Sequence, residues 1–182
     1  MTLLGRIGMA AVLAAGLMGW SAPGQAQEAD QDSALDAVRS LQNALGAPER
    51  GGECPPRAQA LAHQVIALHT QLMVTSVACA DIYGEPDLHA QYRVFTSEHA
   101  DRIRNSQQRI QRTLGGEEAV EVLDQYLAEM ANDEAAVIQQ RSVALYCAMR
   151  NSRFHSLIDA SPDSFGNYAE ELTMRARVRA GC

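Results

Sequence analysis

The sequence predicts an all-α protein: an up-down helical bundle of about four long helices plus a short N-terminal helix, joined by two disulfide bonds. Apolar residues recur at steps of three and four along most of the chain, which is the spacing of one helix face. No stretch of useful length alternates apolar and polar residues as a half-buried strand does. Four cysteines follow an N-terminal segment with the features of an export signal, and paired cysteines are typical of exported chains.

Residues 1–26 have the pattern of a cleaved secretory signal peptide. Arg6 supplies the positive start, residues 7–20 are dominated by Ala, Leu, Met and Gly, and Gly24-Gln25-Ala26 places small residues at the cleavage site. The apolar run is shorter than the roughly 20 residues of a membrane-spanning helix. We therefore expect cleavage near Ala26, a periplasmic or secreted location, and no transmembrane segment in the mature chain.

The length and net charge of the chain limit the classes of protein to which it can belong. A chain of 182 residues can form one domain with its own core. The net charge of −7 favours solubility and argues against a general nucleic-acid binder, which would show a basic face. We therefore expect no nucleic-acid partner.

Residues 27–53 are predicted to form a short helix and a linker that precede the main domain, residues 54–182. Asp32 or Ser33 can cap this helix, and Gly46 is its stop signal. Its apolar stripe consists of Leu35, Val38, Leu41 and Leu45.

The central helix of the main domain is predicted from about residue 57 to Gly84. Between Arg57 and Asp81 the sequence contains no charge, no Gly and no Pro. A helix with so little polar surface lies in the middle of a bundle, with neighbours on several sides. The apolar stripe consists of Leu61, Val65, Leu68, Leu72, Thr75, Cys79 and Ile82.

The second long helix is predicted from about Pro86 to Leu114, with Gly115-Gly116 as the following turn. Its apolar stripe consists of Leu88, Tyr92, Phe95, His99, Ile103, Ile110 and Leu114. Its opposite face, expected to be exposed, carries Glu98, Asp101, Arg102, Arg104, Arg109 and Arg112.

Two further helices complete the predicted bundle. Residues 117–151 are predicted to form one long helix, with a bend or break near Asn132 as the alternative because Asn and Asp favour helix caps. Phe154, Leu157 and Ile158 are expected in the turn that follows. The last helix is predicted to begin with Ser161 as its cap and Pro162 at its first position.

The order of the helices selects one pairing of the four cysteines out of three. In an up-down bundle Cys79 and Cys147 lie near one end, whereas Cys54 and Cys182 lie near the other. Any other pairing would span roughly the length of a helix, although bridged Cα atoms lie only about 4.4–6.8 Å apart. The sequence therefore predicts the bridges Cys79–Cys147 and Cys54–Cys182.

The search for a chemical site yields three candidate ligand-binding residues, His69, His99 and Tyr92. His99 falls on the apolar stripe of the second helix and His69 borders that of the central helix. Alternatively, each histidine has only a structural role at the edge of the core, with one ring nitrogen bonded to a neighbour. No Glu-x-x-His pair, His-Glu-x-x-His motif or Cys-x-x-Cys-His motif is present, so we expect no metal and no cofactor.

These patterns favour a non-enzymatic interaction or structural module of the cell envelope, whose partner is another envelope protein. The alternative is a carrier that binds a small ligand or metal through histidines inside the bundle. No nucleophile elbow is present and each cysteine is assigned to a disulfide, so an enzyme is the least supported class. An exposed apolar patch would favour the interaction module, and a cavity lined by the histidines would favour the carrier.

Overall fold

The computed structural model describes residues 54–114 and 119–182. The predicted signal peptide, the predicted helix within residues 27–53 and the predicted turn at Gly115-Gly116 lie outside the described residues.

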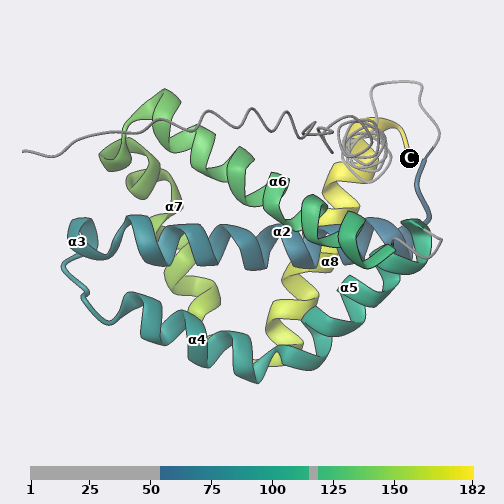
Figure 1. The fold of residues 1–182 in the computed structure, drawn as a ribbon, viewed down its shortest axis with the longest axis horizontal. Helices are drawn as coiled ribbons and strands as arrows, with labels where there is room; N and C mark the ends of the chain where they lie inside the picture. The colour runs from purple at the N-terminus through teal and green to yellow at the C-terminus, as the bar shows by residue number, and fades with distance from the viewer. Residues whose placement is uncertain (1–53, 115–118) are drawn as a thin grey trace, which may run out of the picture.

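The described part of the chain is all-α, with no strand (Figure 1). It contains seven helices, and most of the charge-free segment predicted as the central helix forms the 22-residue helix α2. The helices are α2 (Arg57–Ala78), α3 (Ala80–Tyr83), α4 (Leu88–Glu98), α5 (Ala100–Leu114), α6 (Ala119–Arg141), α7 (Val143–Ile158) and α8 (Pro162–Ala180).

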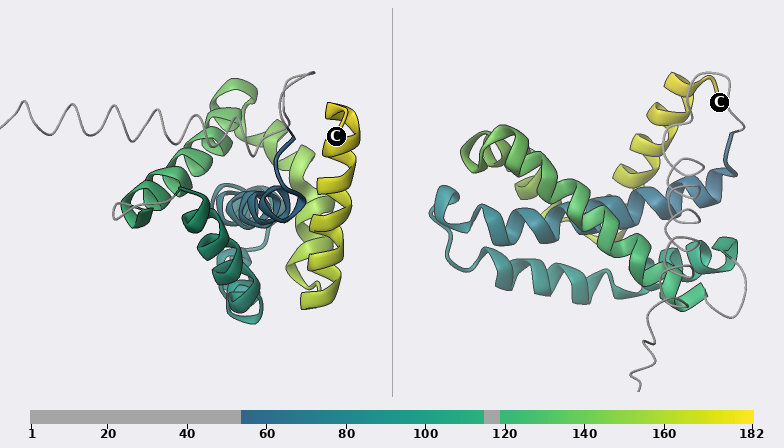
Figure 2. Two further views of the ribbon diagram at one scale, coloured as in Figure 1. Left: turned by 90° about the vertical axis from the view of Figure 1, so that its right-hand side faces the viewer. Right: turned by 45° about the horizontal axis from the view of Figure 1, so that its top comes forward.

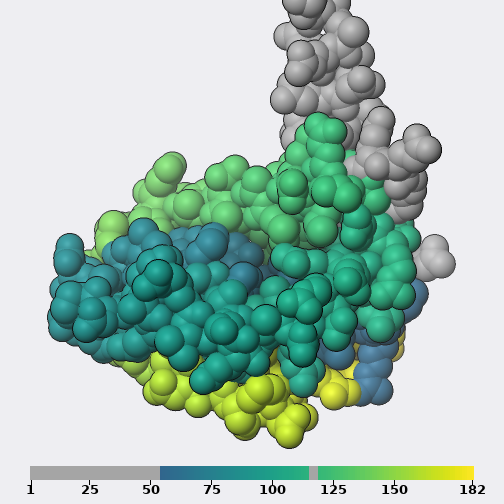
Figure 3. Space-filling view, turned by 60° about the horizontal axis from the view of Figure 1, so that its bottom comes forward, coloured from purple at the N-terminus to yellow at the C-terminus, as the bar shows by residue number. Residues whose placement is uncertain are grey.

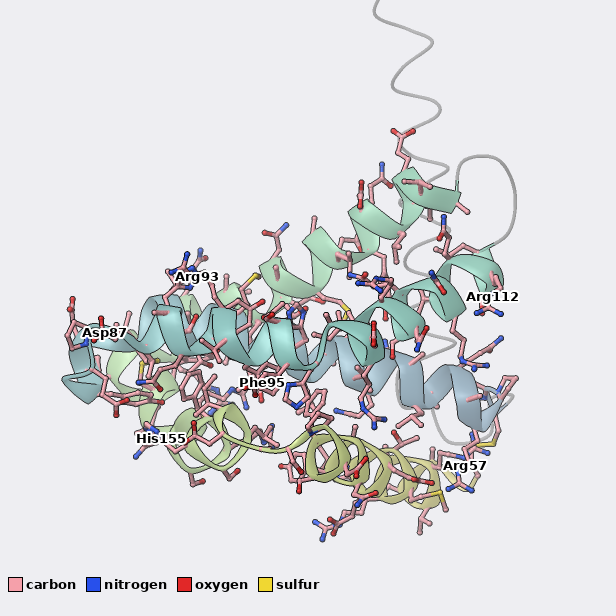
Figure 4. All side chains as sticks on the ribbon, turned by 90° about the horizontal axis from the view of Figure 1, so that it is seen from below. Arg57, Asp87, Arg93, Phe95, Arg112 and His155 are labelled. Carbon is pink, nitrogen blue, oxygen red and sulfur yellow. A yellow bond between two sulfur atoms is a disulfide. The ribbon has the colours of Figure 1, made fainter. Side chains whose placement is uncertain are left out.

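Helix α2 lies at the centre of the fold, as its apolar sequence predicted. It packs against α4, α5, α6, α7 and α8, and α6 and α8 lie on opposite sides of it in the view from below (Figure 4). Burial on several sides explains why this helix has almost no polar face. The side chains of Val65, Ile66, Leu68 and Leu72 are at most 2% exposed.

The core consists of two clusters on different sides of α2. One brings together residues from α2, α4, α7 and α8, and its largest fully buried members are Phe95, Tyr146, Phe154 and Phe165. The other is formed by α2, α5 and α6 around Ile66, Ile110 and Tyr126. A single apolar stripe on α2 would not reach both clusters, because their other helices pack on two different sides of α2.

The predicted helix from Pro86 to Leu114 is broken into α4 and α5 at His99, which the sequence did not indicate. The backbone N–H of His99 donates to the carbonyl oxygen of Phe95 at 3.0 Å, and the ring Nδ1 lies 2.8 Å from the same oxygen. The buried side chain of His99 is thus bonded to the last turn of α4. The two helices leave His99 in visibly different directions (Figure 1).

The prediction of one helix over residues 117–151 is wrong in two respects. The helix continues through Asn132 and breaks instead at Ser142, whose backbone has φ 76° and ψ 150°. The second part, α7, then extends to Ile158, so that Phe154, Leu157 and Ile158 lie in a helix and not in a turn. Their burial in the core explains the extension, since three large apolar side chains need an ordered backbone to pack.

The alternation of helix direction extends over only part of the fold. Helix α2, the α4–α5 pair and α6 run back and forth along the long axis (Figure 1). Helices α7 and α8 instead cross α2 steeply on one side of it (Figure 2). The architecture is therefore a helical assembly around α2, and the prediction of four long alternating helices holds for its first part only.

The helix ends follow the capping rules used for the prediction. Ser161 caps α8, its side-chain oxygen accepting from the backbone N–H of Ser164 at 3.3 Å, and Pro162 is the first residue. Gly84 ends α3 in the left-handed conformation, with φ 70°, which a glycine adopts without strain. Helix α2 itself ends at Ala78, so the predicted central helix is interrupted at Cys79.

Both predicted disulfides are present. The Cα atoms of Cys79 and Cys147 are 5.6 Å apart and those of Cys54 and Cys182 are 5.8 Å apart. The first bridge ties the end of α2 to α7, and the second ties the segment before α2 to the residue after α8. Within residues 54–114 and 119–182, no helix is long and apolar enough to cross a membrane.

Candidate functional site

Two of the three predicted ligand-binding residues meet in the structure. His69 on α2 places Nε2 2.8 Å from the hydroxyl oxygen of Tyr92 on α4 and 3.3 Å from that of Thr96. The hydroxyl of Thr96 in turn donates to the backbone carbonyl of Tyr92 at 2.9 Å. The three side chains form a partly buried polar cluster between α2 and α4.

The surroundings of His69 disfavour its charged form. Burial, together with a smaller effect of the nearby His99, lowers the pKa of His69 to about 4. Burial also raises the pKa of Tyr92, against a smaller opposite effect of the hydrogen bond from Thr96. At neutral pH the imidazole is therefore a neutral hydrogen-bonding group.

His99 does not join this cluster. Its ring is 1% exposed, stacks on Phe95 at a centroid distance of 4.0 Å and meets the edge of Phe165 at 5.0 Å. Since a carbonyl oxygen only accepts, Nδ1 donates to the Phe95 oxygen. The other ring nitrogen, Nε2, is buried and has no partner among the described residues.

A second histidine–tyrosine contact, which the sequence did not indicate, lies on the other side of α2. His63 Nδ1 forms a short hydrogen bond with the hydroxyl of Tyr126 on α6. Burial lowers the pKa of His63 to about 4 and raises the pKa of Tyr126. His63 and His69 are six residues apart on α2, and their rings contact different neighbours, Tyr126 on α6 and Tyr92 on α4.

Glu134 on α6 is the centre of a polar network that sequence reasoning also missed. Its carboxylate accepts from Arg150 Nε at 2.8 Å and from a terminal nitrogen of Arg150 at 3.2 Å. It also accepts from the hydroxyl of Tyr146 at 2.8 Å and from the amide of Gln71 at 3.2 Å. The network links α6, α7 and α2, and each of the other three members is hydrogen-bonded to Glu134, which is typical of a structural network.

Large apolar side chains are exposed on both segments that the Cys79–Cys147 bridge joins. We call the set the bridge-end surface: Val77 (67% exposed), Ile82 (52%), Val143 (41%), Leu145 (48%) and Met149 (44%). The first two come from the end of α2 and from α3, and the other three from the first half of α7. The Tyr83 hydroxyl donates to the Cys147 carbonyl at 2.7 Å and adds to the contact between these segments.

Within the described ranges, no group of three or more His, Cys, Asp or Glu side chains could hold a metal ion. The chain matches no protein-family model, no curated protein and no solved structure in the three comparisons with known proteins.

Proposed function

We propose that this protein is a non-enzymatic interaction module of the cell envelope and that the bridge-end surface contacts another envelope protein. The observation that carries the proposal is the exposure of five large apolar side chains on two segments that one disulfide joins. Large apolar side chains exposed on neighbouring segments of a folded domain are typical of a protein–protein contact site.

The sequence around the bridge supports this role. Neither residues 73–80 nor residues 142–149 include a charged side chain, and the centres of interfaces are depleted of charge. The bridge and the Tyr83 hydrogen bond hold the two segments together before any partner arrives. A surface ordered in advance loses less conformational entropy on binding.

The envelope location rests on two features. Residues 1–26 have the pattern of a signal peptide, and two disulfides with no unpaired cysteine suit an oxidising compartment.

The test is site-specific photo-crosslinking in the cells that make the protein. A photoreactive residue replaces Leu145 in one variant and Met149 in another, and Gln108, an exposed polar residue of α5, in the control. We expect one adduct of defined mass from the first two variants and none from the control.

The adduct's partner is then identified, purified and titrated with the purified module. Leu145→Asp and Met149→Asp are expected to weaken binding by about tenfold or more each, because an unpaired charge would be buried at the contact. Absence of an adduct at both positions contradicts the proposal. An adduct containing only a second copy of this chain contradicts the claim that the partner is another protein.

A further inference from the structure

A hollow of about 530 Å³ lies between α2, α5 and the start of α8. Such a volume falls within the range of about 300–1,000 Å³ typical of small-molecule sites. Leu61, Ala62 and Val65 of α2 form an apolar side, and Pro162 contributes from α8. The opposite, polar side consists of Glu98, His99, Asp101, Arg102, Asn105, Ser106 and Arg109. Figure 3 shows α5 and α8 next to each other on this face of the molecule.

Two residues of the polar side have a buried nitrogen without a hydrogen-bond partner among the described residues, His99 through Nε2 and Arg102 through Nε. Most buried polar atoms in folded proteins are paired. The Nε–H of Arg102 lacks an acceptor, and an acceptor group bound in the hollow would supply one.

Arg102 was predicted on the exposed face of its helix, but it lies half-buried against α8. A Cβ atom at Gly166 would lie 2.5 Å from the guanidinium carbon and 2.6 Å from each terminal nitrogen. Glycine inside a helix costs about 1 kcal/mol relative to alanine. Its presence at this position is explained by the guanidinium that lies flat on it.

The guanidinium of Arg102 is not neutralised by the acidic residues closest to it in sequence. Asp101 instead accepts from Arg104 at 3.1 Å, and no described residue forms an ion pair with Arg102. Arginine presents a planar fork of N–H donors that matches a carboxylate. The first turn of α8, at Pro162, adds the positive end of a helix dipole to the same hollow.

We propose that this hollow binds a small organic carboxylate, with the carboxylate on the guanidinium N–H groups of Arg102, Nε–H included, and the apolar body against Leu61 and Val65. Glu98 and Asp101 also line the hollow and oppose a second negative charge. They favour a monovalent carboxylate over a phosphate. The site is separate from the bridge-end surface, so the proposal does not depend on the interaction with another protein.

The test is calorimetric titration of the oxidised, exported protein with hexanoate and with benzoate, and with inorganic phosphate for comparison. We expect at least one carboxylate to bind with a dissociation constant of about 1 mM or tighter. Phosphate is expected to bind at least about tenfold more weakly, because of the two acidic side chains. No binding of either carboxylate, or tighter binding of phosphate, overturns the proposal.

Variants locate the site. Arg102→Gln and Gly166→Ala are each expected to weaken carboxylate binding by about tenfold, the first by removing the fork and the second by displacing it. Arg112→Gln is the matched control, since Arg112 is on the same helix but is exposed and does not line the hollow. The Gly166→Ala variant keeps every charge and a helix-forming residue, so it remains informative if Arg102→Gln fails to fold. Equal affinity in Gly166→Ala and wild type, or equal loss in Arg112→Gln, overturns the assignment.

Discussion

Glu134 and Arg150 form a two-pronged ion pair across the break between α6 and α7, with N···O distances of 2.8 and 3.2 Å. The side chains of Glu134 and Arg150 are only 14% and 17% exposed. The pair therefore fixes the direction in which α7 leaves α6, and with it the position of the bridge-end surface. An ion pair shielded from water is screened little by salt.

Glu134→Gln is expected to lower the free energy of unfolding by about 2–4 kcal/mol, since it leaves Arg150 uncompensated in a largely buried site. Urea unfolding followed by far-UV circular dichroism measures the change, with both disulfides intact. Glu121→Gln, at an exposed position of α6, is the control and is expected to change stability by less than about 0.5 kcal/mol. Equal stability of the Glu134 and Glu121 variants would show that the pair contributes nothing.

Ser142→Gly is expected to stabilise the protein. The backbone of Ser142 has φ 76° and ψ 150°, a conformation that glycine adopts readily and that costs other residues about 1–3 kcal/mol. The serine side chain accepts from the Leu145 backbone N–H at 3.5 Å, a long contact whose loss to glycine costs only a few tenths of a kcal/mol. The net gain is about 1 kcal/mol by the same urea measurement.

Ser142→Ala separates the two effects. It removes the cap but keeps the strained backbone, so it is expected to lower the free energy of unfolding by about 0.5–1 kcal/mol. A glycine variant less stable than wild type would contradict the strain argument.

The disulfide pairing was predictable from the sequence because it depends only on which end of the assembly each cysteine occupies. Cys79 and Cys147 sit near helix ends on segments that run in compatible directions, and that coarse order survives the interruption at Cys79 and the unpredicted breaks at Ser142 and His99. Ser142 and His99 gave no warning of those breaks, since neither residue type interrupts a helix by itself. Each break depends on a contact or conformation set by the folded core.

The candidate site residues also differ in how far the sequence could predict their contacts. The meeting of His69 and Tyr92 follows from adjacent antiparallel helices, which the sequence indicated. Arg102 was placed on the wrong face because the single predicted helix ignored the change of direction at His99. The contact of Arg102 with Gly166 joins residues 64 positions apart, and no local pattern records it.

His69 is expected to make stability depend on pH below neutrality. Its pKa is about 4 in the folded protein against 6.5 in the unfolded chain, so between these values the unfolded state binds more protons. Its contribution to stability is therefore complete above pH 6.5, is lost as the pH falls towards 4, and changes no further below that.

His69→Gln is expected to remove part of this dependence. Between pH 7 and 4.5 the variant should lose about 1–3 kcal/mol less stability than wild type, one pKa unit corresponding to about 1.4 kcal/mol. Urea unfolding at each pH is followed by far-UV circular dichroism. Gln108→Ala, at an exposed position without a titrating group, is the control and should keep the wild-type slope. Parallel curves for His69→Gln and wild type would contradict the burial of an uncharged imidazole.

The two disulfides are expected to react with reductant in a fixed order. Cys79 and Cys147 are fully buried, whereas Cys54 and Cys182 are exposed. A thiolate must reach a sulfur atom to open the bond, so the Cys54–Cys182 bridge should be reduced first in the folded protein. Its reduction removes a constraint on a segment of 128 residues, worth about 4–5 kcal/mol in the loop-entropy account.

Brief treatment with dithiothreitol, followed by alkylation and peptide mass mapping, measures the order in which the two bridges are reduced. We expect the alkyl label on Cys54 and Cys182 while Cys79 and Cys147 stay unlabelled. Labelling of all four cysteines at the same time would mean that the Cys79–Cys147 bridge is reduced as readily as the Cys54–Cys182 bridge.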